Sequence, residues 1–301
     1  FSKNKEYEIY ALIRKNSLPR FLLKDNVHVF FGDMENSDSL FKALPEGAII
    51  INLAANPYHP KLSYAVNVIG TQNLLEAAKK RNSKKIIHIS SQATKITNKG
   101  VYAKTKAQSD ELVQKSGIPF VILKPSLVVG TDEKGLFSKI VKLLKLLPIV
   151  PVFGDGQTNV YPVLVEDFAR VIESVLHDTT AVDNVFDIGS AKGVSYNELY
   201  LYIMKQAGIS RPFLHIPVKL GLLIAKSLSL LPSPPLYADN ILGSTQDTKC
   251  DTRPFLKRYS DFKFNSFNKE AKKVKVAIVG LGKIGMLHAS ILTFFKDVQI
   301  V

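Results

Sequence analysis

Short apolar runs alternate with helix-length segments through the first part of this chain, and this alternation is the strongest constraint on its fold. Strands are predicted at residues 9–14, 27–31, 48–53, 85–90 and 120–124. Helices are predicted at 64–80 and 102–115, where apolar side chains recur every three or four residues. Strands joined by helix-length connections are typical of βαβ units in a parallel sheet. The pattern therefore predicts an α/β fold with a doubly wound parallel sheet of the Rossmann type.

The pattern changes after residue 130, where prolines and glycines become frequent. An amphipathic helix is predicted at 165–176, and proline turns at 212–235. We expect residues 1–268 to form one domain, whose smaller α+β substrate lobe lies mainly at 131–268. Residues 269–273 then form a charged linker, and a strand at 274–279 opens a second Rossmann domain at 274–301.

The charge of the chain limits the partners that it can bind. Lysine and arginine outnumber aspartate and glutamate by 40 to 26, which gives a net charge of +14 and favours nucleotides, sugar diphosphates or a lipid surface. Nucleic acid is not expected, because the basic residues are dispersed and no aromatic platform lies among them. No metal is expected, because the six histidines never adopt a metal-ligand spacing, and His88 on a strand is expected to be a core residue.

No apolar run is long enough to span a bilayer, which needs about 20 residues. The longest run, 220–231, contains Lys226. Peripheral contact with an anionic membrane stays open, because this run is apolar and because Lys139, Lys142 and Lys145 recur at helical spacing. The single Cys250 predicts a reducing, cytoplasmic location. The chain begins at Phe1, and we interpret it as a piece of a longer protein that could form a homodimer.

Tyr102 and Lys106 carry the strongest chemical signal in the sequence. Four residues apart on a predicted helix, they share one face. An ammonium group there favours the phenolate, so Tyr102 could donate or accept a proton near neutral pH. The same spacing relates Tyr259 to Lys263, but no clear helix follows there, and we interpret this second pair as a surface pair.

Two serines distinguish the first pair from the second. Ser90 and Ser91 end the strand that precedes Tyr102, and ligands bind at the carboxyl ends of parallel strands. Ser91 could therefore hydrogen-bond a substrate oxygen while Tyr102 moves the proton. The alternative is that Tyr102 and Lys106 form an ordinary surface pair on the helix.

The chain resembles the extended short-chain dehydrogenase/reductase family, the NAD-dependent epimerase/dehydratase group, over about 270 residues. It is especially similar to the atypical branch that includes an accessory subunit of respiratory complex I. The resemblance rests on short segments at 32–33, 52–55, 67–77, 89–91 (Ile-Ser-Ser), 102–106 (Tyr-Ala-Lys-Thr-Lys), 124–126 (Lys-Pro-Ser), 153–156 and 163–167.

The resemblance implies roles for individual residues. Tyr102 would be the general acid/base, and Lys106 would tune it while holding the nicotinamide ribose. Ser91, or Ser90 if the register slips by one, would polarise the reacting oxygen, and Asn67 would support a proton relay.

The resemblance also implies NAD or NADP as cofactor. Asp33 would contact the adenine, Ala54 would line the cofactor channel, and Pro125 would begin the loop over the nicotinamide. Arg14 lies where a ribose hydroxyl or a 2′-phosphate would be contacted, although an ordinary surface arginine fits equally well. Lys124 stands where arginine is commoner in the family.

The first strand of the family and its glycine-rich, phosphate-binding turn are missing from this sequence, which puts cofactor affinity in doubt. A glycine turn occurs instead at Gly280, Gly282 and Gly285, after the strand at 274–279. Residues 275–288 resemble the opening of the Gfo/Idh/MocA oxidoreductases, so we predict the start of a second cofactor-binding domain. A further hypothesis is that strand 274–279 fills the missing position between strands 9–13 and 49–53.

Three functions follow from these observations. The first is an NAD(P)-dependent oxidoreductase, epimerase or dehydratase that acts on a nucleotide-linked sugar or a similar secondary alcohol. The second is a nucleotide-binding accessory protein without turnover, as in the complex I branch. The third is a peripheral membrane reductase, which rests on the apolar run at 220–231 and the positive charge.

Overall fold

The computed structural model describes residues 6–14, 25–57, 59–130, 136–231, 234, 236–265, 274–276 and 298–300. The chain divides into two compact units, Phe1–Phe264 and Asn265–Val301. The first unit contains the large sheet and the smaller lobe. The second contains two short strands, β13 (Val274–Val276) and β14 (Val298–Ile300), which pair in parallel.

A four-stranded parallel sheet forms the centre of the first unit. Its order is β10-β5-β4-β3, with β3 (Ile49–Asn52), β4 (Lys85–Ile89), β5 (Phe120–Pro125) and β10 (Asn184–Ile188). Strands β4 and β5 are almost wholly buried, as expected of parallel strands that are covered on both faces.

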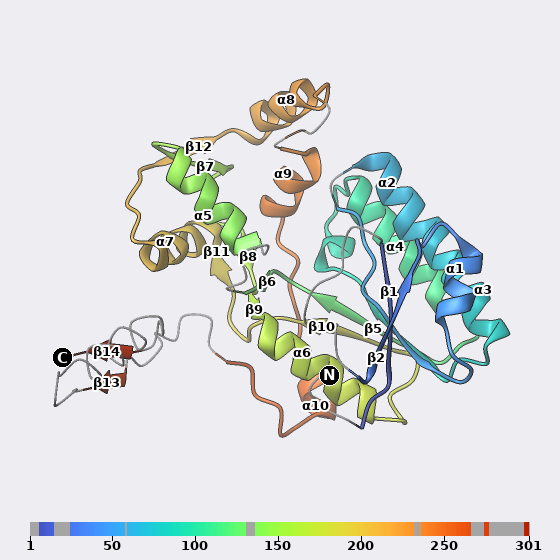
Figure 1. Ribbon diagram of the computed structural model, residues 1–301. Coiled ribbons are helices and arrows are strands. Elements are labelled where there is room, and N and C mark those ends of the chain that lie inside the picture. Colours follow the sequence, from blue (N-terminus) through green and yellow to red (C-terminus); the bar gives the residue numbers. More distant parts are fainter. Residues whose placement is uncertain are drawn as a thin grey trace, which may run out of the picture. The chain divides into compact units, whose positions relative to one another are not determined.

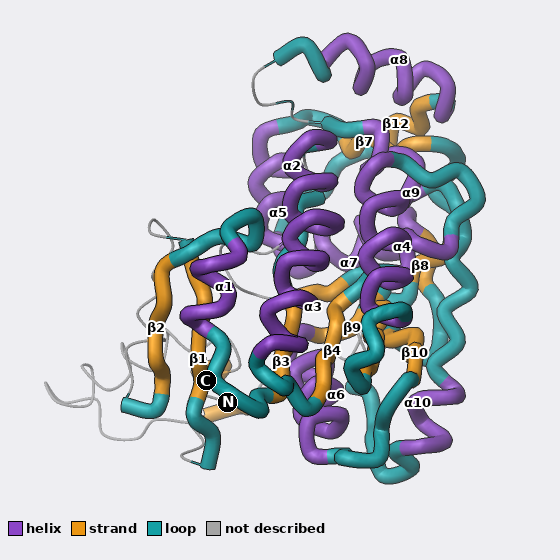
Figure 2. Tube along the Cα trace, turned by 90° about the vertical axis from the view of Figure 1, so that its right-hand side faces the viewer, coloured by secondary structure: helices purple, strands orange, loops and turns teal. Residues whose placement is uncertain are grey.

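Two further parallel strands, β1 (Ile9–Ile13) and β2 (Val27–Phe31), form a separate ladder. In Figure 2 they lie on the β3 side of the large sheet. Among the described residues no strand pairs with the outer edge of β3, or with the edge of β1 that does not face β2. The large sheet and the β1–β2 pair are therefore connected by side-chain packing and not by a backbone ladder.

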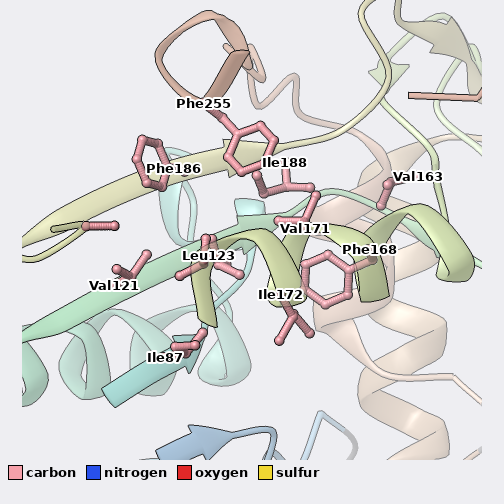
Figure 3. Close-up of a cluster of buried hydrophobic side chains, with 12 residues drawn as sticks. Ile87, Val121, Leu123, Val163, Phe168, Val171, Ile172, Phe186, Ile188 and Phe255 are labelled. Atoms are coloured by element: carbon pink, nitrogen blue, oxygen red, sulfur yellow. The ribbon is translucent and has the colours of Figure 1, made fainter. Parts of the chain in front are cut away.

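Helices cover both faces of the large sheet. On one face, α6 (Val165–His177) and α10 (Arg253–Arg258) pack on the strands; Figure 3 shows Val171 and Ile172 beside Leu123 in this cluster. On the other face, a second apolar cluster includes residues of α1 (Ser37–Ala43), α3 (Gly70–Lys80) and α4 (Val101–Gln114). The structure thus has the doubly wound α/β fold that the alternation of elements predicts.

The smaller lobe lies beyond the carboxyl end of β5 (Figure 1). Its helices are α5 (Leu136–Leu146), α7 (Tyr196–Ala207), α8 (Val218–Leu228) and α9 (Ala238–Ser244). Its short strands are β6 (Val128–Val129), β7 (Val150–Phe153), β8 (Asn159–Val160), β9 (Val163–Leu164), β11 (Val194–Ser195) and β12 (Phe213–Ile216).

The structure corrects one expectation. The segment that contains α6 and β10 falls within 131–268 but belongs to the large sheet, because the apolar face of α6 is buried against β4 and β5. The hypothesis that strand 274–279 fills the position beside β3 stays a prediction, since the described part of this strand, β13, lies in the second unit. The predicted linker at 269–273 lies outside the described residues, and the domain boundaries stay predictions.

Candidate functional site

The predicted site residues of the first unit follow the carboxyl ends of successive parallel strands. Arg14 follows β1 and is exposed, whereas Asp33 follows β2 and is half-buried. Ala54, Ser91 and Pro125 follow or end β3, β4 and β5, respectively. The carboxyl ends of parallel strands are where open α/β sheets bind their ligands.

Lys106 on α4 reaches the carboxyl end of β4. Its Nζ donates a hydrogen bond to the carbonyl of Ile89, the last residue of that strand, at 2.6 Å. Only 1% of Lys106 is exposed. Burial lowers the pKa of its ammonium group from 10.5 to about 8, and the carboxylate of Asp110 opposes this shift. The strand end that leads into Ser91 therefore holds a buried cation that can lose its proton in mildly alkaline solution.

A buried polar network surrounds this lysine. Asp110, one further turn along α4, accepts a hydrogen bond from Ser90 Oγ at 2.8 Å and pairs with Lys124 Nζ at 2.9 Å. Lys124 also donates to Thr94 Oγ1 at 3.1 Å. The carboxylate of Asp110 thus interacts with both Lys106 and Lys124 inside the fold, where an unpaired charge would be costly.

His88 is the neutral member of this network. Asn52 Nδ2 donates to its Nδ1 at 3.1 Å, and Ser109 Oγ already donates its proton to the Lys106 carbonyl. His88 Nε2, 3.2 Å from Ser109 Oγ, is therefore assigned as the N–H donor. Complete burial lowers the pKa of His88 well below 6.5, and the charges of Lys106 and Lys124 add to the effect. The expectation of a core histidine is confirmed.

Asn67 lies in a π-helical turn, η2 (Ala65–Ile69), between α2 (Pro60–Tyr64) and α3. Such turns are rare and occur often at functional sites. Its side chain accepts from Asn56 N at 3.0 Å and donates to Thr105 Oγ1 at 3.0 Å. Thr105 is the neighbour of Lys106 on α4. Asn67 therefore connects the α2–α3 segment to the helix that carries the predicted catalytic pair.

Tyr102 lies in the first turn of α4 and is half-buried. The backbone N–H groups of Val101 and Tyr102 donate to the carboxylate of Asp239 on α9, at 3.1 and 3.0 Å. A carboxylate is favourable at a helix N-terminus, where the N–H groups lack intrahelical partners. Burial raises the pKa of Asp239, while the N–H groups of α4 oppose the shift. The smaller lobe thereby caps the helix that carries Tyr102.

The two candidate serines have different environments. Ser90 is buried and its hydroxyl is bonded to Asp110. Ser91 is half-buried, caps the short helix η3 (Gln92–Lys95), and accepts from Ala93 N at 3.1 Å through its hydroxyl oxygen. That hydroxyl keeps its proton for another acceptor, since the bond uses only an oxygen lone pair. These surroundings favour Ser91 over Ser90 for a role toward substrate.

The residues predicted to hold the nicotinamide lie at neighbouring positions in the fold, whereas the predicted phosphate-binding residues are only partly described. Lys106, Ser91 and Pro125 belong to neighbouring strand ends and the adjoining helix. In the described part of the first unit, no glycine-rich turn joins a strand of the large sheet to a helix N-terminus. Gly280, Gly282 and Gly285 lie outside the described residues.

Three other features of the described chain bear on the predictions. An open depression of about 480 Å³ in the smaller lobe is lined by Gly154, Asp155, His215 and Pro217. Among the described residues, no three histidine, cysteine or acidic side chains gather as metal ligands. Tyr259 packs in the aromatic cluster with Phe186 and Phe255.

Sequence reasoning missed Asp110 and Asp239. Asp110 follows Lys106 by four residues, so the helical spacing that relates Tyr102 to Lys106 also places it on their face. Asp239 gives no comparable signal, because its partner at Tyr102 is 137 residues away in the chain.

Comparison with known proteins identifies the family. Residues 1–189 match the NAD dependent epimerase/dehydratase family. The chain belongs to this family. It is 24% identical over 248 residues to 3beta-hydroxysteroid-dehydrogenase/decarboxylase isoform 2 of Arabidopsis thaliana, covering 69% of this chain and 43% of that protein. It is also 24% identical over 233 residues to the mitochondrial NADH-ubiquinone oxidoreductase 40 kDa subunit of Neurospora crassa, covering 76% and 60%.

The chain therefore spans about half the length of these curated relatives. Among solved structures, it is similar to the UDP-glucose 4-epimerase of Thermus thermophilus in complex with NAD. The TM-score is 0.57 at 21% identity, covering 68% of this chain and 77% of that one. At this identity the likeness concerns the fold. The family therefore includes relatives named as enzymes and relatives named as subunits of a respiratory complex.

Proposed function

We propose that this family member is an NAD(P)-dependent oxidoreductase, epimerase or dehydratase of the short-chain dehydrogenase/reductase type. Its substrate would be a nucleotide-linked sugar or a similar secondary alcohol. The sugar-nucleotide epimerase among its structural relatives and the net charge of +14 both support an anionic substrate.

Each site residue then has a chemical task. Bound NAD or NADP would supply a nicotinamide ring for hydride exchange with the carbinol carbon of the substrate. Tyr102 exchanges the hydroxyl proton, and Ser91 hydrogen-bonds the same oxygen. Lys106 supplies a positive charge one helical turn from Tyr102, which favours the phenolate. Asn67 and Asp239 position α4 from its two sides.

The observation that carries this proposal is the hydrogen bond from Lys106 to Ile89. It brings a buried ammonium to the carboxyl end of β4, next to Ser91 and one turn along α4 from Tyr102. Cofactor contacts by Arg14, Asp33, Ala54 and Pro125 belong to the same proposal.

The test is a pair of tyrosine-to-phenylalanine variants. We expect Tyr102→Phe to abolish turnover of a nucleotide-sugar while binding of NADH or NADPH, followed by fluorescence, is retained. Tyr259→Phe is the matched control, because Tyr259 also precedes a lysine by four residues but packs among aromatic rings. Turnover that survives in Tyr102→Phe would refute the proposal.

A non-catalytic accessory role is the second candidate, favoured by the subunit of NADH-ubiquinone oxidoreductase among the relatives. Tight NADPH binding without turnover of any alcohol or nucleotide-sugar would support it. Changing Tyr102 or Lys106 would then affect no measured rate.

Several finer expectations accompany the proposal. NAD and NADP both remain open at Arg14, and homodimerisation and a cytoplasmic location stay predictions. Among the helices that the structure describes, none qualifies as a membrane-spanning segment by its length and hydropathy. That a second Rossmann domain of the Gfo/Idh/MocA type begins at 274 stays a prediction, of which the structure describes only the parallel β13–β14 pair.

A further inference from the structure

Helix α8 has apolar side chains on two faces, of which one is buried. Gly221 and Ala225 face inward. A Cβ at Gly221 would lie 2.7 Å from the Phe153 ring and 3.3 Å from Ile241 of α9, so the helix approaches the lobe closely there. This contact buries only the inner face of α8.

The outer face of α8 carries an uncovered apolar stripe. Leu220, Leu223 and Ile224 follow each other at helical spacing and are 48%, 60% and 37% exposed. After the helix, Leu230 and Leu231 are 88% and 49% exposed. An apolar stripe of this kind marks an interaction surface. In both Figure 1 and Figure 2, α8 lies at the outer end of the smaller lobe.

The charges around this stripe have one sign. Lys219 and Lys226 are exposed on α8 and lie two helical turns apart. The sequence has no aspartate or glutamate between Glu198 and Asp239, whereas it has Lys205 and Arg211 there as well. The stripe is therefore bordered by cations without nearby acidic residues in the sequence.

We propose that α8 and the segment to Leu231 bind the surface of an anionic lipid bilayer. The stripe of Leu220, Leu223 and Ile224 would enter the headgroup–acyl boundary, while Lys219 and Lys226 contact anionic headgroups. The 11 residues of α8 are too few to span a bilayer, so the helix lies in the plane of the surface.

A second copy of the chain fits this surface less well. A two-fold interface places the same patch on both subunits, so the lysines of one α8 would meet those of the other. No acidic residue of α8 or of the segment that follows it to Leu231 would offset them. An anionic bilayer supplies both an apolar layer and the opposite charge.

The experiment is vesicle co-sedimentation of the whole chain. We expect binding to phosphatidylcholine vesicles that contain phosphatidylglycerol, weak binding to pure phosphatidylcholine, and loss of binding at high salt. Leu220→Ser/Leu223→Ser/Ile224→Ser should abolish binding. Lys219→Gln/Lys226→Gln should weaken it at least tenfold, since each lysine near such a surface contributes roughly 1 kcal/mol, or about fivefold.

Leu201→Ser is the matched control, because Leu201 on α7 is 54% exposed and lies outside the stripe. It should bind vesicles like the unchanged chain, and unchanged thermal melting of all variants shows that they fold. The proposal is overturned if the chain ignores anionic vesicles, or if the triple variant still binds them. It is also overturned if the triple variant dissociates a dimer in sedimentation velocity while vesicle binding persists.

Discussion

Lys106 is a cation held almost entirely out of water. Desolvation disfavours its charged form, so the pKa falls to about 8, and the native state loses this proton more easily than the unfolded chain does. The carboxylate of Asp110 reduces this cost, and the carbonyl of Ile89 accepts a hydrogen bond from the ammonium group. Burial of this ammonium group, on which the proposed catalytic role depends, therefore lowers stability at neutral pH.

The lowered pKa of Lys106 predicts how the free energy of unfolding depends on pH. Between about 8 and 10.5 the unfolded state binds more protons at this lysine than the folded state, so stability rises with pH in that window. Relative to Lys106→Met, we expect the unchanged chain to gain on the order of 3 kcal/mol across it. Denaturant unfolding at a series of pH values measures this gain. Parallel curves for the two proteins would contradict it.

Asp110 gives a second prediction at the same scale. Asp110→Asn leaves Lys106 and Lys124 as buried or half-buried cations without their carboxylate, and we expect a loss of about 3 kcal/mol of unfolding free energy. The adjacent Glu111 pairs with Lys115 on the surface, at 3.7 Å. Glu111→Gln should therefore cost less than about 1 kcal/mol. Equal losses in urea unfolding would show that the buried network carries no special stability.

Helix α4 depends on the smaller lobe for its first turn. Asp239 of that lobe accepts from the first N–H groups of the helix. Gln246 accepts a hydrogen bond from the N–H of Asn98 and donates one to its carbonyl, in the loop that leads to α4. The position of Tyr102 is therefore set by a lobe that follows it far along the chain.

Removing this cap should affect both stability and activity. We expect Asp239→Ala to lose about 1 kcal/mol, typical of a lost helix N-cap, and to lower turnover because Tyr102 is less well held. Asp239→Asn keeps one acceptor oxygen and should have an intermediate effect. Thermal melting and steady-state kinetics test both. Unchanged kinetics in Asp239→Ala would show that the cap does not position the tyrosine.

At the scale of the whole molecule, the two parallel sheets of the first unit differ in how far their strands are buried. The β1–β2 pair is joined to the large sheet by side chains such as Leu12 and by α1, and its strands are largely half-buried. Strands β4 and β5 have partners on both sides and are buried. Two-stranded ladders are marginal without such support.

We therefore expect amide hydrogen exchange to be much faster in β1 and β2 than in β4 and β5. Exchange measured by mass spectrometry on peptides from the two regions gives the comparison. Similar protection in both regions would mean that the first unit opens as one cooperative block.

Many of the strands and helices can be predicted from the local pattern of apolar residues in the sequence. Buried parallel strands need continuous apolar runs and helices need three-to-four spacing, so the strands at 27–31 and 120–125 and the helix at 101–114 were predictable within about a residue. The prediction of a site at Tyr102, Lys106 and Ser91 depends on strand ends and helix spacing, which are local properties of the sequence, and it stays a prediction. Domain boundaries and the glycine turn beyond 276 stay predictions.

The amino-acid sequence by itself determined the parallel α/β fold, the order of its strands and helices, and the helix face that Tyr102 and Lys106 share. Tertiary structure alone decided that Lys106 is buried against Ile89, that Asp239 caps α4 and that the outer stripe of α8 stays uncovered. The physical reason is the separation along the chain between the groups that interact. Periodicity records which side of an element is apolar, whereas burial, pKa and capping depend on groups brought together from distant parts of the chain.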